Sequence, residues 1–419
     1  MSTVPRRALV APTLLAIGST LASQAGHAQG FIEDSSARLD LRNIYFNRDF
    51  REDAGQSKRE EWAQGFLLNI ESGFTPGVVG FGLDAQALLG IKLDSSPDRT
   101  GTGLLPRDSD NRAEDDFSTL GLTAKARASQ SEVYVGTLFP KLPTLQPNNS
   151  RILPQTFEGA MVSIGEIESL AVSLGHLESV RYRNSSGSDE LALNNKNGRF
   201  GGSFNANHFQ WVGADYQFTP GLAGSFHLAQ LDDLYRQQFL GLAWEQPLGE
   251  GVLTSELRVA FSEEQGSALA GDIDNQAWQG RVSYGRSGHV VTAALQKLRG
   301  DNAFPYINGS NPYLVNFVQI NDFAEAGQRS IQLRYDYDFE AIGVPGLIFM
   351  TRYVRGDQGR PLAGGEAREW ERDSELMYVV QSGSLKNLGI RWRNASYRSS
   401  FARDADENRL ILSYSLPIW

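Results

Sequence analysis

The sequence contains no cysteine among its 419 residues. This absence excludes a disulfide framework, and it excludes metal centres or nucleophiles built on a thiolate. An excess of positive charge is also missing, because the formal net charge at pH 7 is −10. Such a chain lacks the basic stripe that is typical of nucleic-acid-binding proteins, so we expect no nucleic-acid partner.

Long apolar runs and catalytic signatures are scarce as well. Beyond the N-terminus, no stretch approaches the roughly 20 apolar residues that a membrane-spanning helix needs. The chain has five histidines but neither H-E-x-x-H nor G-x-S-x-G. Gly80-x-Gly82-x-x-Ala85 matches the glycine spacing of a dinucleotide-binding loop, but it lies within a strand-like run instead of opening a helix. We therefore expect no cofactor, no metal and no enzymatic activity.

The first residues have the three-part pattern of a secretory signal peptide. Two arginines precede a mostly apolar run, Ala8 to Leu21, and small residues follow up to Ala28. The run is too short for a membrane anchor, and cleavage fits after Ala25 or after Ala28. The sequence thus predicts a signal peptide over residues 1–28 and a single mature domain over residues 29–419.

The mature part alternates between apolar and polar residues with a period of two. From Leu410 to Ile418, every second residue is leucine, tyrosine or isoleucine, and Arg409 opens the intervening, more polar series. Similar alternation runs through 38–45, 331–337 and 388–393. Because the polar faces repeatedly carry arginine and the apolar faces carry leucine and aromatic residues, the pattern favours an all-β, transmembrane antiparallel barrel with a lipid-facing exterior.

The connectors between these segments are of two kinds. Short turns rich in proline and glycine occur at 75–77, 219–221 and 344–346. Long polar connectors cover 94–116, 140–156, 181–207, 302–323 and 356–371. This asymmetry is typical of outer-membrane barrels, in which the periplasmic turns are short and the extracellular loops are long.

Several segments resemble the OprD/Occ family of outer-membrane carboxylate channels, which are substrate-specific porins. The matching segments include Gly30–Ser35, Arg42–Asp49, Trp62–Phe66, Glu71–Phe74, Gly80–Asp84, Leu153–Thr156 and Tyr378–Gln381. The resemblance covers nearly the whole mature chain. It implies a monomeric porin barrel of about 18 strands in the outer membrane of a Gram-negative bacterium. It also implies an inward-folded constriction loop, here at about 139–157.

The resemblance further implies a row of basic side chains that leads through the pore. Carried over residue by residue, this row contains Arg48, Arg59, Arg151, Arg391, Arg393 and Arg409. One position departs from the family, because Met377 stands where other members have lysine.

Residue parity supports part of this row independently. Arg38 and Arg42 share one face of the first strand with Arg48, and Arg391 and Arg393 share one face of a late strand. Closure of a barrel makes the first and last strands neighbours, so these residues converge on one wall. Such a wall attracts anions, and the planar guanidinium group can bind both oxygens of a carboxylate.

Four alternatives stay open at this point. The arginines could simply be paired with lumenal carboxylates such as Asp40, Asp336 and Glu375 and stabilise the wall. The solutes, for which small aromatic or cyclic monocarboxylates are favoured, could instead be basic amino acids or peptides. The barrel could also be an outer-membrane lipase or protease, or a plugged structural barrel. In each case we expect contact with outer-membrane lipid and lipopolysaccharide.

Overall fold

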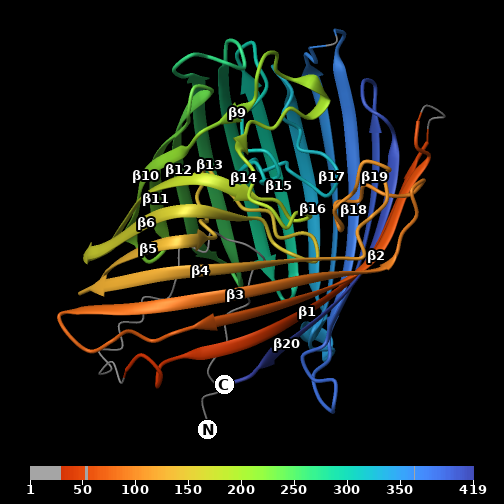
Figure 1. Cartoon of the computed structure of the whole chain (residues 1–419). Coiled ribbons are helices and arrows are strands. Elements are labelled where there is room, and N and C mark those ends of the chain that lie inside the picture. The colour runs from red at the N-terminus through yellow and green to blue at the C-terminus, as the bar shows by residue number, and fades with distance from the viewer. Residues whose placement is uncertain (1–29, 52–54, 363) are drawn as a thin grey trace.

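The computed structural model describes residues 30–51, 55–362 and 364–419. The signal peptide predicted over residues 1–28 lies outside these ranges. Eighteen strands form one closed antiparallel sheet, because each long strand pairs with the next along the chain and β20 pairs with β1 (Figure 1). The predicted all-β barrel of about 18 strands is therefore confirmed.

The strands of the first half are β1 (Ser36–Phe50), β2 (Lys58–Glu71), β3 (Val79–Asp94), β4 (Asp116–Ala128), β5 (Ser131–Leu138), β6 (Thr156–Ile167), β7 (Leu170–Arg181), β10 (Phe209–Thr219) and β11 (Leu222–Leu231). The strands of the second half are β12 (Tyr235–Leu248), β13 (Gly251–Glu264), β14 (Asp274–Arg286), β15 (His289–Arg299), β16 (Arg329–Asp338), β17 (Leu347–Gly359), β18 (Ala367–Val379), β19 (Gly389–Ser399) and β20 (Ala405–Pro417). A small separate hairpin, β8 (Leu191–Ala192) with β9 (Asn205–Ala206), and two short 3-10 helices, η1 (Lys196–Gly198) and η2 (Phe339–Ile342), lie in the connectors. Among the described residues, no helix is long and apolar enough to cross a membrane.

The outer face of the sheet is apolar and the inner face is polar, which is the reverse of the arrangement in a water-soluble protein. Leu120 and Leu333 on the outer face are 66% and 62% exposed, whereas Gln296 and Glu371 on the inner face are fully buried. This arrangement follows from the period-two alternation, since successive side chains of a strand point to opposite faces. An apolar exterior around a polar interior is what lipid demands of a spanning barrel.

The two-residue turns lie at one end of the barrel and the longest connectors lie at the other. The predicted proline- and glycine-rich turns all join strands at one end, where 129–130, 220–221 and 287–288 are only two residues long. The longest connectors, 182–208 and 300–328, lie at the other end. One predicted long connector is much shorter than expected, because β17 and β18 extend to Gly359 and Ala367 and leave only seven residues between them.

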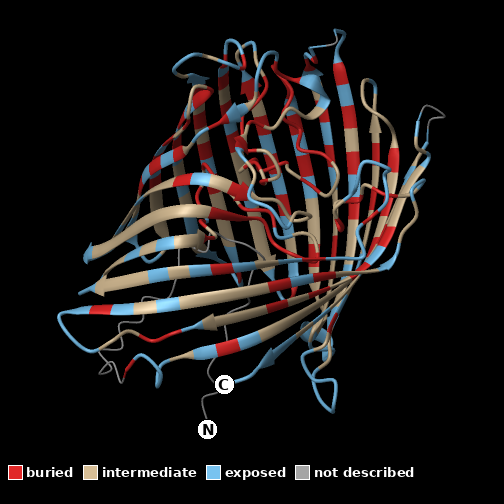
Figure 2. Cartoon of the chain, in the orientation of Figure 1, coloured by how far each residue is buried: buried red, intermediate tan, exposed pale blue. Residues whose placement is uncertain are grey.

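The connector between β5 and β6 folds into the lumen. Its residues Ile152 and Leu153 are 0% and 2% exposed and pack against an apolar cluster on the inner faces of β1 to β4. A Cβ atom added to Gly65 on β2 would lie 2.6 Å from the carbonyl oxygen of Ile152, so only glycine allows this approach. Buried loop segments inside the ring of strands are visible in Figure 2. The predicted inward-folded loop is thus confirmed.

Candidate substrate pathway through the pore

Closure of the barrel brings the predicted arginines of the last and first strands onto one wall. Arg393 on β19, Arg409 on β20 and Phe46 on β1 stand side by side at one level of the register. Arg391 and Arg42 lie on the same face at successive levels nearer the short turns. The parity argument therefore places these side chains on the inner face, as predicted.

The next level toward the long loops continues the same wall. Glu407 on β20, Arg48 on β1 and Arg59 on β2 are aligned there. Arg59 stacks on Phe50, with its guanidinium carbon 5.4 Å from the ring centroid. Since all of these residues share the lumen face, basic side chains occupy successive levels from the short-turn end to the loop end.

Phe46 lies at the centre of a group of arginines on this wall. The guanidinium carbons of Arg409, Arg151 and Arg48 lie 4.8, 5.1 and 5.6 Å from the centroid of its ring. The ring is 1% exposed, so it is held between these cations and the wall. A cation within about 6 Å of an aromatic face is attracted by the ring quadrupole. One phenylalanine thus gathers arginines from two strands and from the inward-folded loop.

Arg151 belongs to the inward-folded loop and is fixed by backbone acceptors. Its Nε donates to the carbonyl oxygen of Thr102 at 2.9 Å, and Nη1 donates to that of Ser150 at 3.1 Å. Burial, together with repulsion from Arg409 and Arg183, lowers the pKa of Arg151 well below its ordinary value. Burial and repulsion from Arg409 also lower the pKa of Arg183 to about 10. The repulsive contributions from neighbouring arginines show that several cations lie close together here.

Two carboxylates hold four of the arginines. Glu407 accepts from Arg48 and from Arg409, each Nε lying 2.6 Å from an oxygen. Glu375 lies 3.0 Å from Nε of Arg393 and 3.4 Å from Nε of Arg391. Ion pairing thus exists for these four arginines, as the structural-pairing alternative expects, but each carboxylate is shared between two cations.

Three further arginines of the row form no ion pair with any described carboxylate. These are Arg42, Arg59 and Arg151. Arg42 instead donates to the side-chain oxygen of Asn149 at 2.5 Å and to the carbonyl oxygen of Arg151 at 3.3 Å, and so ties the loop to β1. The row therefore has an excess of positive charge within the lumen.

Two predicted positions lie at the edge of this arrangement. Arg38 shares the lumen face but lies at the short-turn end, where its Nε is 3.0 Å from Asp40 and 58% of its side chain is exposed. Met377 faces the lumen opposite Arg391, and its sulfur lies 3.0 Å from Nη2 of that residue. The missing lysine therefore leaves the cations of β19 in place beside an uncharged side chain.

Sequence reasoning missed Phe46, Arg183 and the acidic face of β18. Phe46 reads as an ordinary strand residue, and its role appears only when the inward-folded loop is in position. Arg183 lies just after β7 and reaches the site by donating to Ser150 Oγ at 3.2 Å. The run Glu369, Glu371, Asp373 and Glu375 could have been recognised, because its spacing of two places every carboxylate on one face.

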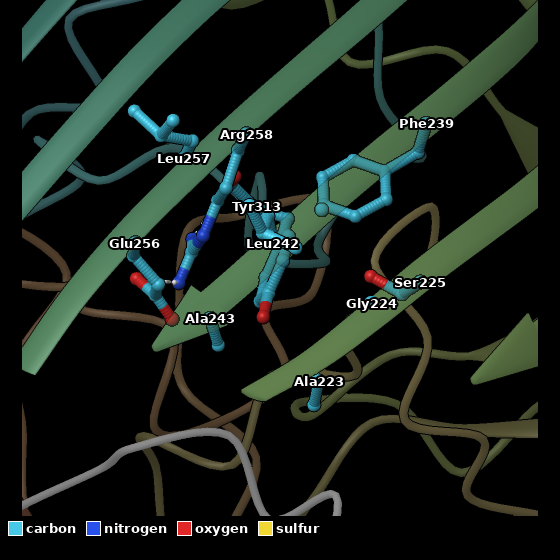
Figure 3. Close-up of a pocket in the computed structure, with 11 residues that line it drawn as sticks. Ala223, Gly224, Ser225, Phe239, Leu242, Ala243, Glu256, Leu257, Arg258 and Tyr313 are labelled. Atoms are coloured by element: carbon cyan, nitrogen blue, oxygen red, sulfur yellow. Dashed lines mark hydrogen bonds and ion pairs between the residues drawn. The ribbon is translucent and has the colours of Figure 1, made fainter. Parts of the chain in front are cut away.

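The opposite wall, on β11 to β13, carries paired charges around a narrow crevice (Figure 3). Arg258 stacks on Tyr313 at 3.9 Å from the ring centroid, and its Nη2 lies 2.8 Å from Glu256. Arg281 also lies 2.8 Å from Glu256. Within the described residues, no group of three or more histidine, aspartate or glutamate side chains could hold a metal ion.

Comparison with known proteins places this geometry in a family. The model of the outer membrane porin, OprD family, matches residues 29–418. The porin-like protein GalP of Pseudomonas putida is 38% identical over 408 residues, which cover 96% of this chain and 97% of that protein.

Two solved structures from Pseudomonas aeruginosa are similar over the whole barrel. OccK5 (OpdH) is 56% identical with a TM-score of 0.85, and OpdK, solved with vanillate, is 40% identical with a TM-score of 0.88. Each comparison covers 93% of this chain and 100% of the other. These relatives are channels of the outer membrane and not enzymes. The chain therefore belongs to the OprD family of outer-membrane porins.

Proposed function

We propose that the barrel is a diffusion channel for small carboxylates, with aromatic and cyclic monocarboxylates favoured. The observation that carries this proposal is the group of Arg48, Arg151 and Arg409 around Phe46. Among the described residues, Glu407 is the only carboxylate that forms an ion pair with this group. An anion that enters the constriction compensates the excess charge. A guanidinium group offers two parallel donors that match the two oxygens of a carboxylate.

Transit requires several sites of modest strength, because a single tight site would trap the solute. The eight predicted residues, Arg38, Arg42, Arg48, Arg59, Arg151, Arg391, Arg393 and Arg409, provide such a series. Seven of them lie on the inner faces of β1, β2, β19 and β20, and Arg151 lies on the inward-folded loop, so that a carboxylate can exchange one cation for the next. The low-dielectric wall strengthens each contact and raises the local concentration of anions.

The acidic face of β18 bears on the alternative of basic amino acids. Glu371 accepts from the backbone N–H groups of Ile320 and Asn321, at 2.8 and 2.9 Å, and Glu369 accepts from Gln328 at 2.6 Å. Asp373 accepts from Nε of Arg352 at 2.7 Å, and Glu375 is held by the arginines of β19. Since these carboxylates already serve protein donors, the observation favours anionic over cationic solutes.

The aromatic preference has separate support. OpdK was solved with vanillate, which is an aromatic monocarboxylate, and that protein is 40% identical to this chain. In this chain, the half-buried ring of Phe50 stands beside the guanidinium group of Arg59 in the pathway. We also propose that the channel is a monomer and that its outer face contacts lipid and lipopolysaccharide.

Single-channel recording on the protein in planar bilayers tests this function. Benzoate added on the loop side should block the chloride current at lower concentration than acetate, and L-arginine should block weakly. A silent bilayer would support a plugged structural barrel. Stronger block by L-arginine than by benzoate would overturn the proposal in favour of a channel for basic amino acids.

A further inference from the structure

A group of cations on the outer face of the barrel has no part in the pore. Near the loop ends of β15 to β18, Lys297, Arg299, Arg355 and Arg372 occupy outward positions. The alternation fixes this direction, since Glu371, beside Arg372, is 0% exposed on the lumen face. These four cations are called the outer basic patch below.

The protein leaves the charge of the outer basic patch uncompensated. None of its members forms an ion pair with a described carboxylate, whereas Arg329 and Arg360 beside it pair with Asp357 at 2.9 Å and Asp301 at 3.1 Å. Moreover, Lys297 lies directly opposite Arg329 across β15 and β16, and like charges in that position repel. An anion from outside the chain would relieve this repulsion.

The depth of the patch corresponds to the membrane surface. Leu295 and Ile331, which pair with each other on the outer face, are 52% and 53% exposed, and Arg355 is the next cross-strand neighbour of Ile331. Arg299 lies over Trp278, with its guanidinium carbon 5.8 Å from the ring centroid. Outward tryptophan marks the boundary between hydrocarbon and headgroups. The patch therefore lies beside lipid-facing apolar side chains, at the level where lipid headgroups begin.

An outward cation on another side of the barrel provides a comparison. Arg236 on β12 is an outward cation at the same end of the barrel, but its Nε lies 2.6 Å from Glu263 on the neighbouring strand. The charge of this outward cation is compensated within the protein, unlike the charges of the outer basic patch. A localised group of uncompensated cations favours the binding of a particular ligand over a general contribution to solubility.

We propose that the outer basic patch binds the phosphate groups of a phosphorylated glycolipid in the outer leaflet. The proposal rests on the topology of the proposed function, because the long-loop end faces that leaflet. Arginine and lysine at a headgroup level attract anionic lipid phosphates. The acyl chains of such a lipid would lie against Leu295 and Ile331.

Native mass spectrometry of the purified full-length protein tests the site, with diphosphorylated lipid A as the probe. The variant Arg299→Gln, Arg355→Gln, Arg372→Gln should bind lipid A far more weakly, with each removed charge weakening binding by about fivefold. The charge-matched control Arg236→Gln, Arg286→Gln, Lys386→Gln lies elsewhere on the surface and should bind as the unmodified protein does. Single variants of Lys297, Arg355 and Arg372 give the same test if the triple variant does not assemble.

The outcomes separate the lipid site from the pore. Equal lipid A binding by patch and control variants would overturn the proposal, as would equal binding of dephosphorylated lipid A or of phosphatidylglycerol by the unmodified protein. Benzoate block recorded on the same preparations should be unchanged by the patch variant. A channel without benzoate block but with patch-dependent lipid A binding would overturn only the proposed solute.

Discussion

Arg48 and Glu407 face each other across the strand pair that closes the barrel, with Nε of Arg48 2.6 Å from Oε2 of Glu407. The other oxygen of Glu407 accepts from Nε of Arg409 at the same distance. Glu407 is fully buried. It therefore links the two strands that close the barrel, and its negative charge offsets part of the positive charge at the constriction.

The first prediction concerns Glu407. Glu407→Gln should lower the free energy of unfolding by about 3–5 kcal/mol, since it leaves buried cations without their carboxylate. The same change should raise anion selectivity. Urea unfolding in detergent and reversal potentials in a salt gradient measure the two effects. Glu366→Gln, which disrupts an exposed pair with Arg368, is the control and should change neither. Reduced anion selectivity in Glu407→Gln would contradict the assigned role.

A second prediction concerns the loops at the mouth of the pore. Arg199 in the connector 182–208 pairs with Asp322 at 2.7 Å and with Glu325 at 2.8 Å, both in the connector 300–328. Burial alone would raise the pKa of Asp322, but Arg199 and Lys196 outweigh it and hold that pKa well below the ordinary value.

The sign of the pH dependence follows. A carboxylate with a depressed pKa in the folded state contributes stability that is fully present above its unfolded pKa, about 3.9, and is lost as pH falls below that value. Loop contact should therefore be constant from pH 7 to 5 and should weaken in stronger acid. Current noise in single-channel records is the measurement, and Asp322→Asn should show the acid behaviour at pH 7. Quiet records for Asp322→Asn would mean that the pair does not hold the loops.

The third prediction concerns the topology in the membrane. Because the chain has no native cysteine, an introduced cysteine is the only thiol that can be labelled. A cysteine replacing Asp110 in the long connector 95–115 should react on intact cells with an impermeant maleimide. A cysteine replacing Ser382 in the turn between β18 and β19 should react only after the outer membrane is opened. The reverse pattern would place the long loops in the periplasm.

The sequence predicted what depends on local alternation and missed what depends on distant segments. Arg42, Arg48, Arg391 and Arg393 could be assigned to the lumen face, because parity within one strand decides the face. Parity does not show where along the barrel axis a residue lies. Arg38 was therefore grouped with the other arginines, although it lies at the short-turn end. The packing around Phe46 was equally hidden, since it depends on the fold of a loop about 100 residues away.

The connector predicted over 356–371 shows a related limit. Its many charged residues read as a loop, but Glu369 and Glu371 face the lumen while Arg368 and Arg372 face outward, and the segment is mostly strand. Polar residues on both faces are compatible with a barrel strand near its loop end, where the outer face has left the hydrocarbon. Hydropathy alone could not distinguish the two structures.

The fourth prediction compares two neighbouring arginines of the row, Arg391 and Arg393. Arg391→Gln and Arg393→Gln each leave Glu375 with one cation, so the melting temperature should change little in either variant. Each should slow benzoate flux several-fold without abolishing it, because other cations remain and a charge-assisted contact is worth about 1.5–3 kcal/mol before screening. Liposome uptake and thermal unfolding check the two effects. A fall in melting temperature with unchanged flux would assign both residues to structure alone.

Benzoate block of Arg151→Ala tests most directly whether uncompensated arginines at the constriction attract carboxylates. Arg151 forms no ion pair with any described carboxylate, so its loss leaves no acidic partner exposed, and the barrel strands are untouched. The concentration for half-maximal block should rise several-fold, anion selectivity should fall, and Arg151→Lys should recover part of both. A folded Arg151→Ala channel with unaltered block and selectivity would contradict the role of the constriction in carboxylate transit.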